Sequence, residues 1–265
     1  SEGRLMDQPA PVGVSLASSI TFSPSLSSEK CKITRIETHA RTEVVDPGVY
    51  VLDEFLSPAQ CLEVIKYAQK TGLEGSGKGY PSSYRRLHRC DFLGDGKFAS
   101  MMFSRLTRIG SNRTHPKECA FRLKQRLRGA VGINRFWRIS RYTETQFFSP
   151  HQDGSYTPAS DPKLHSELSI VIYLNQDFQG GLTRFFKDIT IAGSPGAVIR
   201  PKIGSMLIFD HLLWHEGAPV IKGTKWIIRS DIMFDTARPP PSLHPKLSLK
   251  TSESKTSESK TSESK

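Results

Sequence analysis

Residues 147–156 read FFSPHQDGSY and place a histidine and an aspartate two positions apart, directly before a glycine. Successive side chains of a β-strand point to opposite faces, so His151 and Asp153 share a face if this stretch is extended. An imidazole and a carboxylate directed at one point supply two ligands of a metal site. A third ligand must then come from elsewhere in the chain.

His215, in the stretch WHEGAPV at 214–220, is the candidate third ligand and follows Asp153 by about 60 residues. Two histidines and one carboxylate in this arrangement match the 2-His-1-carboxylate triad, which holds Fe(II) on one face and leaves coordination positions open. A bidentate 2-oxo acid and dioxygen can share the open positions. We therefore interpret these three residues as a candidate iron site.

The histidines also allow other interpretations. The chain has 8 histidines, so a single HxD pair can arise by chance, and such pairs are more often structural. His211 and His215 also have the spacing of a zinc-binding HExxH helix, but HLLWH lacks the glutamate and follows a β-rich run. We reject the zinc helix and assign His211 a supporting or substrate-side role.

A 2-oxo diacid bound to iron would bury its second carboxylate, which requires a paired cation. Lys225 and Arg229 lie four residues apart in a predicted strand and therefore share a face. Arginine would pair bidentately, whereas lysine acts as a compact point charge. The residues alone leave open which of the two binds the cosubstrate.

The elements that position these residues change along the chain. We predict a strand over 49–52, a helix that begins after Ser57 and Pro58 and ends at Gly72, and helices over 93–110 and 115–127. From about residue 131 the hydrophobic period becomes two. The fold class expected is mainly β with packed N-terminal helices, a double-stranded β-helix (jelly roll, cupin-like).

Composition limits the domain to the middle of the chain. Residues 1–30 are rich in Ser, Pro and Ala, and residues 251–265 are three copies of TSESK, so we expect both segments to be disordered around one domain at 31–250. No stretch is apolar enough for a membrane span. The four cysteines fit no metal or disulfide pattern, which slightly favours a cytoplasmic or nuclear location, although a targeting segment could precede Ser1.

Two motifs resemble the prolyl 4-hydroxylase family of Fe(II)/2-oxoglutarate dioxygenases. RYTETQFFSPHQDGSY resembles that family's RYxxGxxFxxHxD block, and HEGAPVIKGTKW resembles its HxGxPVxxGxKW block. FLSPAQCLEVI resembles its first helix, and SELSIVIYLNQDFQGGLTRFF its strand and GGxTxF turn. The resemblance runs from about residue 46 to residue 235, with the motifs in the family's order.

The resemblance implies a jelly roll and a set of site residues. His151, Asp153 and His215 would hold Fe(II), and Lys225 would bind the distal carboxylate of 2-oxoglutarate. Tyr142 would hydrogen-bond the cosubstrate, and Thr183 matches the threonine of the turn. Arg229 and the pair Glu144-Thr145, where the family often has a glycine, depart from the pattern.

The function expected is Fe(II)- and 2-oxoglutarate-dependent hydroxylation of an unactivated C–H bond in a peptidyl or small-molecule substrate. Dioxygen is the second cosubstrate, and ascorbate is a further candidate cofactor. The net charge of +11 favours an acidic partner. The alternative is a basic nucleic-acid- or protein-binding module on the same scaffold, using the Arg/Lys-rich stretch 122–138, although no nucleic-acid motif is present.

Substrate-binding features are less specific. Aromatic residues near the site either line a pocket or pack in the core: Phe136, Trp137, Phe148 and Tyr156. The loops 72–86 and 155–165 have the Gly/Ser/Pro-rich composition of lids. The basic cluster around Tyr84, Arg85, Arg86 and Arg89 either recognises an acidic substrate or solvates a helix edge. The sequence gives no indication of the oligomeric state.

Overall fold

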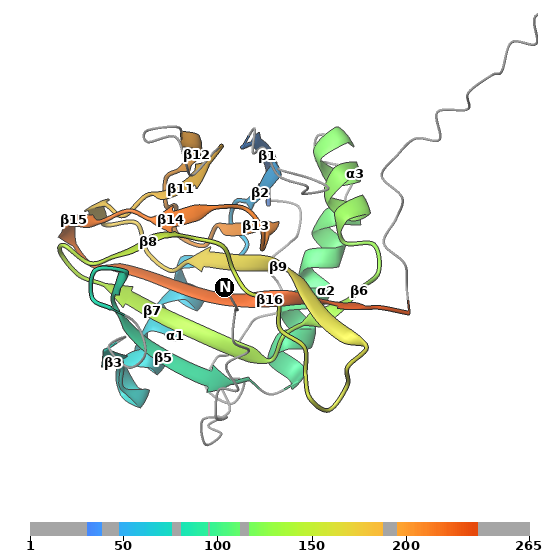
Figure 1. The fold of residues 1–265 in the computed structure, drawn as a ribbon, viewed down its shortest axis with the longest axis horizontal. Helices are drawn as coiled ribbons and strands as arrows, with labels where there is room; N and C mark the ends of the chain where they lie inside the picture. Colours follow the sequence, from blue (N-terminus) through green and yellow to red (C-terminus); the bar gives the residue numbers. More distant parts are fainter. Residues whose placement is uncertain are drawn as a thin grey trace, which may run out of the picture.

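The computed structural model describes residues 31–38, 48–75, 81–94, 96–111, 117–187 and 195–237. The predicted disordered segments 1–30 and 251–265 lie outside these residues. The predicted end of the domain at residue 250 lies outside them as well. Part of the candidate lid at 72–86 is also outside them. The described residues form two layers of β-strands, with helices against the outer face of one layer (Figure 1).

Three helices precede most of the sheet among the described residues: α1 (Pro58–Thr71), α2 (Gly96–Ser111) and α3 (Lys117–Arg126). The first begins as predicted, because Ser57 accepts a hydrogen bond from the Gln60 backbone while the Gln60 side chain accepts one from the Ser57 backbone. This capping box satisfies two backbone donors at the start of the helix. Gly72 follows the last turn with a positive φ of 95°, which a glycine adopts at little cost.

The main sheet contains nine strands among the described residues, with β1 at one edge and β3 at the other. Its strands are β1 (Ile33–Glu37), β2 (Gly48–Leu52), β3 (Glu74–Gly75), β5 (His88–Leu93), β6 (Ala130–Ile133), β7 (Phe136–Tyr142), β9 (Leu164–Tyr173), β13 (Met206–Asp210) and β16 (Lys225–Asp235). The order is β1-β2-β13-β9-β16-β7-β5-β3, with β6 also paired to β16.

A smaller sheet faces the main one. It has the order β12-β11-β14-β8-β4 and consists of β4 (Arg85–Arg86), β8 (Phe147–His151), β11 (Thr183–Phe186), β12 (Pro195–Ile199) and β14 (His215–Gly217). A ribbon of β10 (Phe178–Gly180) and β15 (Val220–Gly223) extends one end. Figure 1 shows β8, β11, β12 and β14 gathered beside the long strands β9, β16 and β7, with α1 behind those strands.

Two separate hydrophobic cores follow from this layering. One core packs the helices against the main sheet and contains Val64, Phe98, Trp137 and Ile228. The other lies between the two sheets and contains Tyr142, Tyr173, Phe185 and Phe209. Strands of the main sheet therefore bury both faces, as in the predicted double-stranded β-helix. None of the described helices has the length and apolar character needed to cross a membrane.

The structure corrects one boundary and one interpretation. The helix predicted from residue 93 begins at Gly96, because residues 88–93 form β5. The basic residues Arg85, Arg86 and Arg89 consequently lie on strands β4 and β5, so the suggestion that they solvate a helix edge is wrong. In HRCDFL the apolar Cys90 and Phe92 pack against the helices, which leaves Arg89 and Asp91 on the other face.

Candidate metal centre

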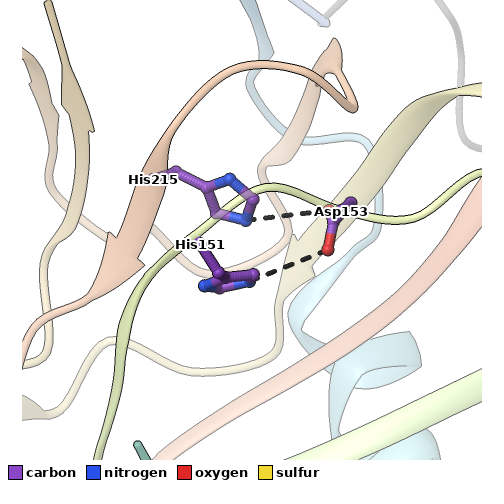
Figure 2. A group of neighbouring side chains, drawn as sticks. All are labelled: His151, Asp153 and His215. Carbon is purple, nitrogen blue, oxygen red and sulfur yellow. Dashed lines mark ion pairs between the residues drawn. The ribbon is translucent and has the colours of Figure 1, made fainter. Parts of the chain in front are cut away.

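The three predicted ligands meet between the two sheets. His151 ends β8 and His215 begins β14, and the two residues are direct partners in the antiparallel register. Asp153 lies two residues after β8, where its backbone N–H donates to the His211 carbonyl 2.9 Å away. Figure 2 shows the two imidazoles and the carboxylate pointing toward one another. The pairing of β8 with β14 therefore brings together residues that are far apart in the sequence.

The distances within this group suit a single ion. His151 Nε2 lies 3.7 Å from Asp153 Oδ1, and His215 Nε2 lies 3.6 Å from Asp153 Oδ2. One ligand atom from each of the three residues lies within 4.8 Å of the other two. Bonds of about 2.0–2.2 Å to a central ion, at angles of roughly 90–110°, place the ligand atoms about 3–3.5 Å apart, slightly closer together than they lie here. The three side chains can hold a metal ion without moving far.

Backbone carbonyls fix which imidazole nitrogen faces the centre. His151 Nδ1 is 2.8 Å from the Ser149 carbonyl, and His215 Nδ1 is 2.9 Å from the Leu213 carbonyl. A carbonyl only accepts hydrogen bonds, so each Nδ1 carries the proton and each Nε2 presents a lone pair. His151 Nε2 is buried and has no hydrogen-bond partner among the described residues. A buried acceptor without a partner is costly, and a bound cation would satisfy it.

The electrostatics keep the ligands deprotonated. Burial, reinforced by the neighbouring His215, lowers the pKa of His151 to about 3. Burial also lowers the pKa of His215. Burial alone would raise the pKa of Asp153, but Arg229 and the two histidines outweigh it, so this pKa lies well below its usual range. Neutral imidazoles and an ionised carboxylate are the forms that bind metal.

A shell of polar residues orients Asp153. Arg229 Nη2 lies 2.9 Å from Asp153 Oδ1, and Ser169 Oγ donates to Oδ2. His211 is buried and contacts Ser169 Oγ at 2.9 Å through Nδ1 and Ser166 Oγ at 2.9 Å through Nε2. His211 thus takes a supporting position behind the carboxylate. Ser169 was not singled out from the sequence, although it precedes Tyr173 by four residues on the same face of β9.

A buried lysine lies in a second polar region between the sheets. Lys225 is 3% exposed, and its Nζ donates to the Gly181 carbonyl at 2.7 Å. The rings of Tyr142 and Tyr173 each have their centres 5.5 Å from this Nζ. Burial lowers the pKa of Lys225 to about 7. No carboxylate of the described residues pairs with Lys225, so its buried charge suits an anionic ligand.

Thr183 lies beside this polar region at the start of β11. Its Oγ1 is 2.6 Å from the hydroxyl of Tyr173, which is buried at the end of β9. Gly181 precedes the strand with a positive φ of 59°, and a Cβ at this position would lie 3.1 Å from Lys225 Cδ. A glycine therefore lets the turn close over the lysine. Tyr173 was also missed in the sequence, where SIVIY reads only as an apolar strand.

The two candidate cations have different surroundings. Arg229 is engaged by Asp153 and lies 3.8 Å from Asp231 through the same Nη2 atom. These two carboxylates raise its pKa although burial lowers it. Lys225, in contrast, has a carbonyl and two aromatic rings around it. The geometry therefore favours Lys225 over Arg229 as the partner of a ligand carboxylate.

The predicted aromatic lining divides between site and core. The Phe148 ring stacks on His151 with ring centres 3.6 Å apart and an angle of 15°. Trp137 is fully buried against Phe98 on the helix side of the main sheet, so it is a core residue. Phe136 is half-buried and Tyr156 is exposed. Of these four residues, Phe148 alone contacts a triad residue in the ring contacts of the described chain.

Two arginines of the basic stretch 122–138 are engaged in ion pairs. Arg122 pairs with Glu118 at 3.1 Å. Arg126 pairs with Glu167 at 3.0 Å and with Asp210 at 2.8 Å. These carboxylates neutralise part of the positive charge on which phosphate binding depends. The arrangement gives no support to the binding-module alternative.

Comparison with known proteins gives a family match over part of the chain. Residues 137–230 match the family described as the 2OG-Fe(II) oxygenase superfamily. This match contains the triad, Lys225 and Thr183, and over these residues it confirms the predicted resemblance to Fe(II)- and 2-oxoglutarate-dependent dioxygenases. No curated protein matches the chain.

Similar solved structures include three prolyl hydroxylases. A viral collagen prolyl hydroxylase from Paramecium Bursaria Chlorella virus-1, in complex with 2OG, is 22% identical with a TM-score of 0.47, covering 70% of this chain and 96% of the other. A Pseudomonas putida prolyl-4-hydroxylase is 16% identical with a TM-score of 0.47, covering 69% and 91%. A Trichoplax adhaerens prolyl hydroxylase in complex with a hypoxia inducible factor peptide fragment is 15% identical with a TM-score of 0.48, covering 72% and 84%.

Proposed function

We propose that this chain, which carries a 2OG-Fe(II) oxygenase domain over residues 137–230, hydroxylates an unactivated C–H bond of a peptidyl or small-molecule substrate. The observation that supports it most is the buried group of two imidazole Nε2 atoms and one carboxylate, all within 4.8 Å of one another. Three ligands on one side of an ion leave positions for a cosubstrate and dioxygen.

His151, Asp153 and His215 would hold Fe(II) in this proposal. When bound, the iron supplies the activation of dioxygen that C–H hydroxylation requires. The Ser149 and Leu213 carbonyls hold the imidazoles in the tautomer that binds metal. The protein's part is to present deprotonated ligands in a fixed orientation.

Lys225 would bind the distal carboxylate of 2-oxoglutarate. Its ammonium is held by the Gly181 carbonyl, and a carboxylate beside it would supply the counter-charge that the described residues lack. Tyr142 lies directly opposite Lys225 in the β16–β7 register and would donate its hydroxyl to the cosubstrate. The hydroxyls of Thr183 and Tyr173, which already contact each other, would be the remaining polar groups beside the cosubstrate.

The packing around these residues would exclude water from the reaction. Phe185 and Phe209 lie against the His215 ring, with ring centres 5.8 Å and 4.7 Å away. Phe148 covers His151 on the other side. A site enclosed by aromatic rings strengthens the electrostatic interactions within it and limits side reactions.

The experiment that tests this function measures 2-oxoglutarate consumption and succinate formation with added Fe(II), with and without candidate substrates. His151→Ala and Asp153→Ala should each abolish turnover. His165→Gln is the matched control, because His165 pairs with Glu167 at 2.9 Å outside the triad. A His151→Ala protein that consumed 2-oxoglutarate at the wild-type rate would rule out the proposal.

A further inference from the structure

A row of charged side chains crosses the main sheet next to the triad. Arg138 on β7 is the direct register partner of Arg229 on β16 and of Asp91 on β5. Directly paired residues share a face, so these three side chains lie on the inner face, toward the smaller sheet. Because Arg229 contacts Asp153, the row reaches the candidate iron ligand. Arg138 is thus one strand away from the metal centre.

Most charges in this row have partners. Arg89 pairs with Asp91 at 2.8 Å, and Arg229 is shared between Asp153 and Asp231. Arg138 differs, because its side chain has no hydrogen bond to the described residues and no carboxylate of those residues lies within the 4.0 Å of an ion pair. Its one close partner is the Phe136 ring, whose centre lies 4.7 Å from Cζ.

The surroundings of Arg138 make this lack of a partner unfavourable. Burial, followed by the charge of Arg229, lowers the pKa of Arg138, and the more distant charges of Asp231 and Asp91 offset this only in part. Like charges directly opposite each other in a sheet are destabilising. An anion bound beside Arg138 would relieve both effects. The side chain is half-buried, so part of it is accessible to solvent.

The smaller sheet adds another cation on the opposite side. Arg85 on β4 is buried, and its Cζ lies 5.2 Å from the centre of the Phe148 ring, which stacks on His151. Its charge acts on Asp91 and on Tyr142 of the main sheet. Positive charge therefore exceeds negative charge around the triad: Arg85, Arg89, Arg138, Arg229 and Lys225 face Asp91, Asp153 and Asp231.

Resting on the proposed function, we propose that the substrate carries a carboxylate that pairs with Arg138 while its reacting carbon lies at the metal centre. One guanidinium pairs bidentately with one carboxylate. Asp91 and Asp231 lie on the strands at either side of Arg138. Their negative charges would repel a phosphate dianion more strongly than the single charge of a carboxylate. The carboxylate belongs either to an acidic side chain of a peptide or to a free amino acid.

The test uses the full chain, loaded with Fe(II) and 2-oxoglutarate without oxygen, and two matched sets of probes. The first set is two proline-centred peptide libraries whose flanking positions carry glutamate in one library and glutamine in the other. The second set is free amino acids, each beside its primary amide. Titration gives the Kd, and admission of oxygen then gives the yield of product heavier by one oxygen atom.

At least one set should show a preference of tenfold or more for the probe with the carboxylate. Arg138→Gln should remove that preference and change KM more than kcat. Arg138→Lys keeps the charge but not the bidentate geometry, so an intermediate preference is expected. Arg141→Gln is the matched control, because Arg141 lies on the opposite face of β7 beside Trp226. Thermal unfolding midpoints of Arg141→Gln and Arg138→Gln, compared with that of the wild type, test whether both variants fold.

Equal affinity for charged and uncharged probes in both sets would overturn the inference, as would a preference that survives in Arg138→Gln. Binding of a single-stranded oligonucleotide in place of either set would overturn it as well. In each of these cases the proposed dioxygenase function would still be supported if the wild type consumes 2-oxoglutarate and His151→Ala does not. Absence of that consumption in the wild type would instead reject the proposed function itself.

Discussion

Arg229 Nη2 lies 2.9 Å from Asp153 Oδ1, so one of the two cations considered for cosubstrate binding is already paired with a candidate iron ligand. The pair is almost inaccessible to solvent, with 18% and 5% of the two side chains exposed. Removing one partner of a buried ion pair leaves an uncompensated charge, which is strongly destabilising. Arg229 therefore supplies the counter-charge of Asp153 when no metal ion is bound.

Arg229→Met should lower the free energy of unfolding by about 3–5 kcal/mol in the metal-free protein. Saturating Mn(II), used as a probe that does not oxidise readily, should recover part of this loss, because the ion replaces Arg229 as the counter-charge of Asp153. Urea unfolding followed by circular dichroism, with and without Mn(II), measures both effects. The same loss of stability in both conditions would contradict the role.

Lys225→Met should raise the KM for 2-oxoglutarate by roughly 10- to 100-fold, since a charge-assisted hydrogen bond contributes about 1.5–3 kcal/mol. The effect on kcat should be smaller, because the distal carboxylate takes no part in the reaction. Lys222→Met, at an exposed position of β15, is the control and should leave KM unchanged. Steady-state rates at varied 2-oxoglutarate decide this, and an unchanged KM in Lys225→Met would exclude Lys225 as the anchor.

The affinity for 2-oxoglutarate should fall as the pH rises above 7. Burial lowers the pKa of Lys225 to about 7, so in the free protein the amine becomes increasingly neutral above this pH. Pairing with a carboxylate favours the protonated form, so binding takes up a proton. The Kd should therefore rise by about tenfold per pH unit between 7.5 and 9.

Anaerobic calorimetry in two buffers of different ionisation enthalpy measures both the Kd and the proton uptake. Lys225→Arg is the control, because a guanidinium stays charged throughout this range and should give a flat profile. A wild-type Kd that does not change with pH would show that Lys225 is fully protonated in the free protein.

The metal ligands could be predicted from the sequence because their chemistry is local. In an extended stretch the spacing of His151 and Asp153 puts both on one face, and few residue types other than His, Asp, Glu and Cys bind iron. The choice between Lys225 and Arg229 could not be made in this way, since both lie on the same face of one strand. At about 3.3 Å per residue they are separated by about 13 Å, and only the pairing of β16 with its neighbours shows which one meets Asp153.

The residues that the sequence did not reveal have roles that depend on contacts between strands. Ser169 and Tyr173 lie in an apolar run, and their importance follows from their contacts with Asp153 and Thr183. The strand at 88–93 was missed because Arg89 and Asp91 interrupt its apolar character. Those charges are tolerated because they face the polar row beside the triad instead of the hydrophobic core.

Thr145 occupies the position where the family pattern has a glycine, and its backbone has a positive φ of 64°. A left-handed conformation costs a residue with a Cβ about 1–2 kcal/mol, and β-branched residues adopt it rarely. Thr145→Gly should relieve this strain but add flexibility to the unfolded chain, so we expect a net gain in stability of about 0.5–1 kcal/mol. Thr143→Gly, at a neighbouring position without a positive φ, should lower stability instead. Thermal unfolding of the two variants beside the wild type measures the difference, and a Thr145→Gly protein that melts below Thr143→Gly would show that the threonine makes contacts outweighing its backbone strain.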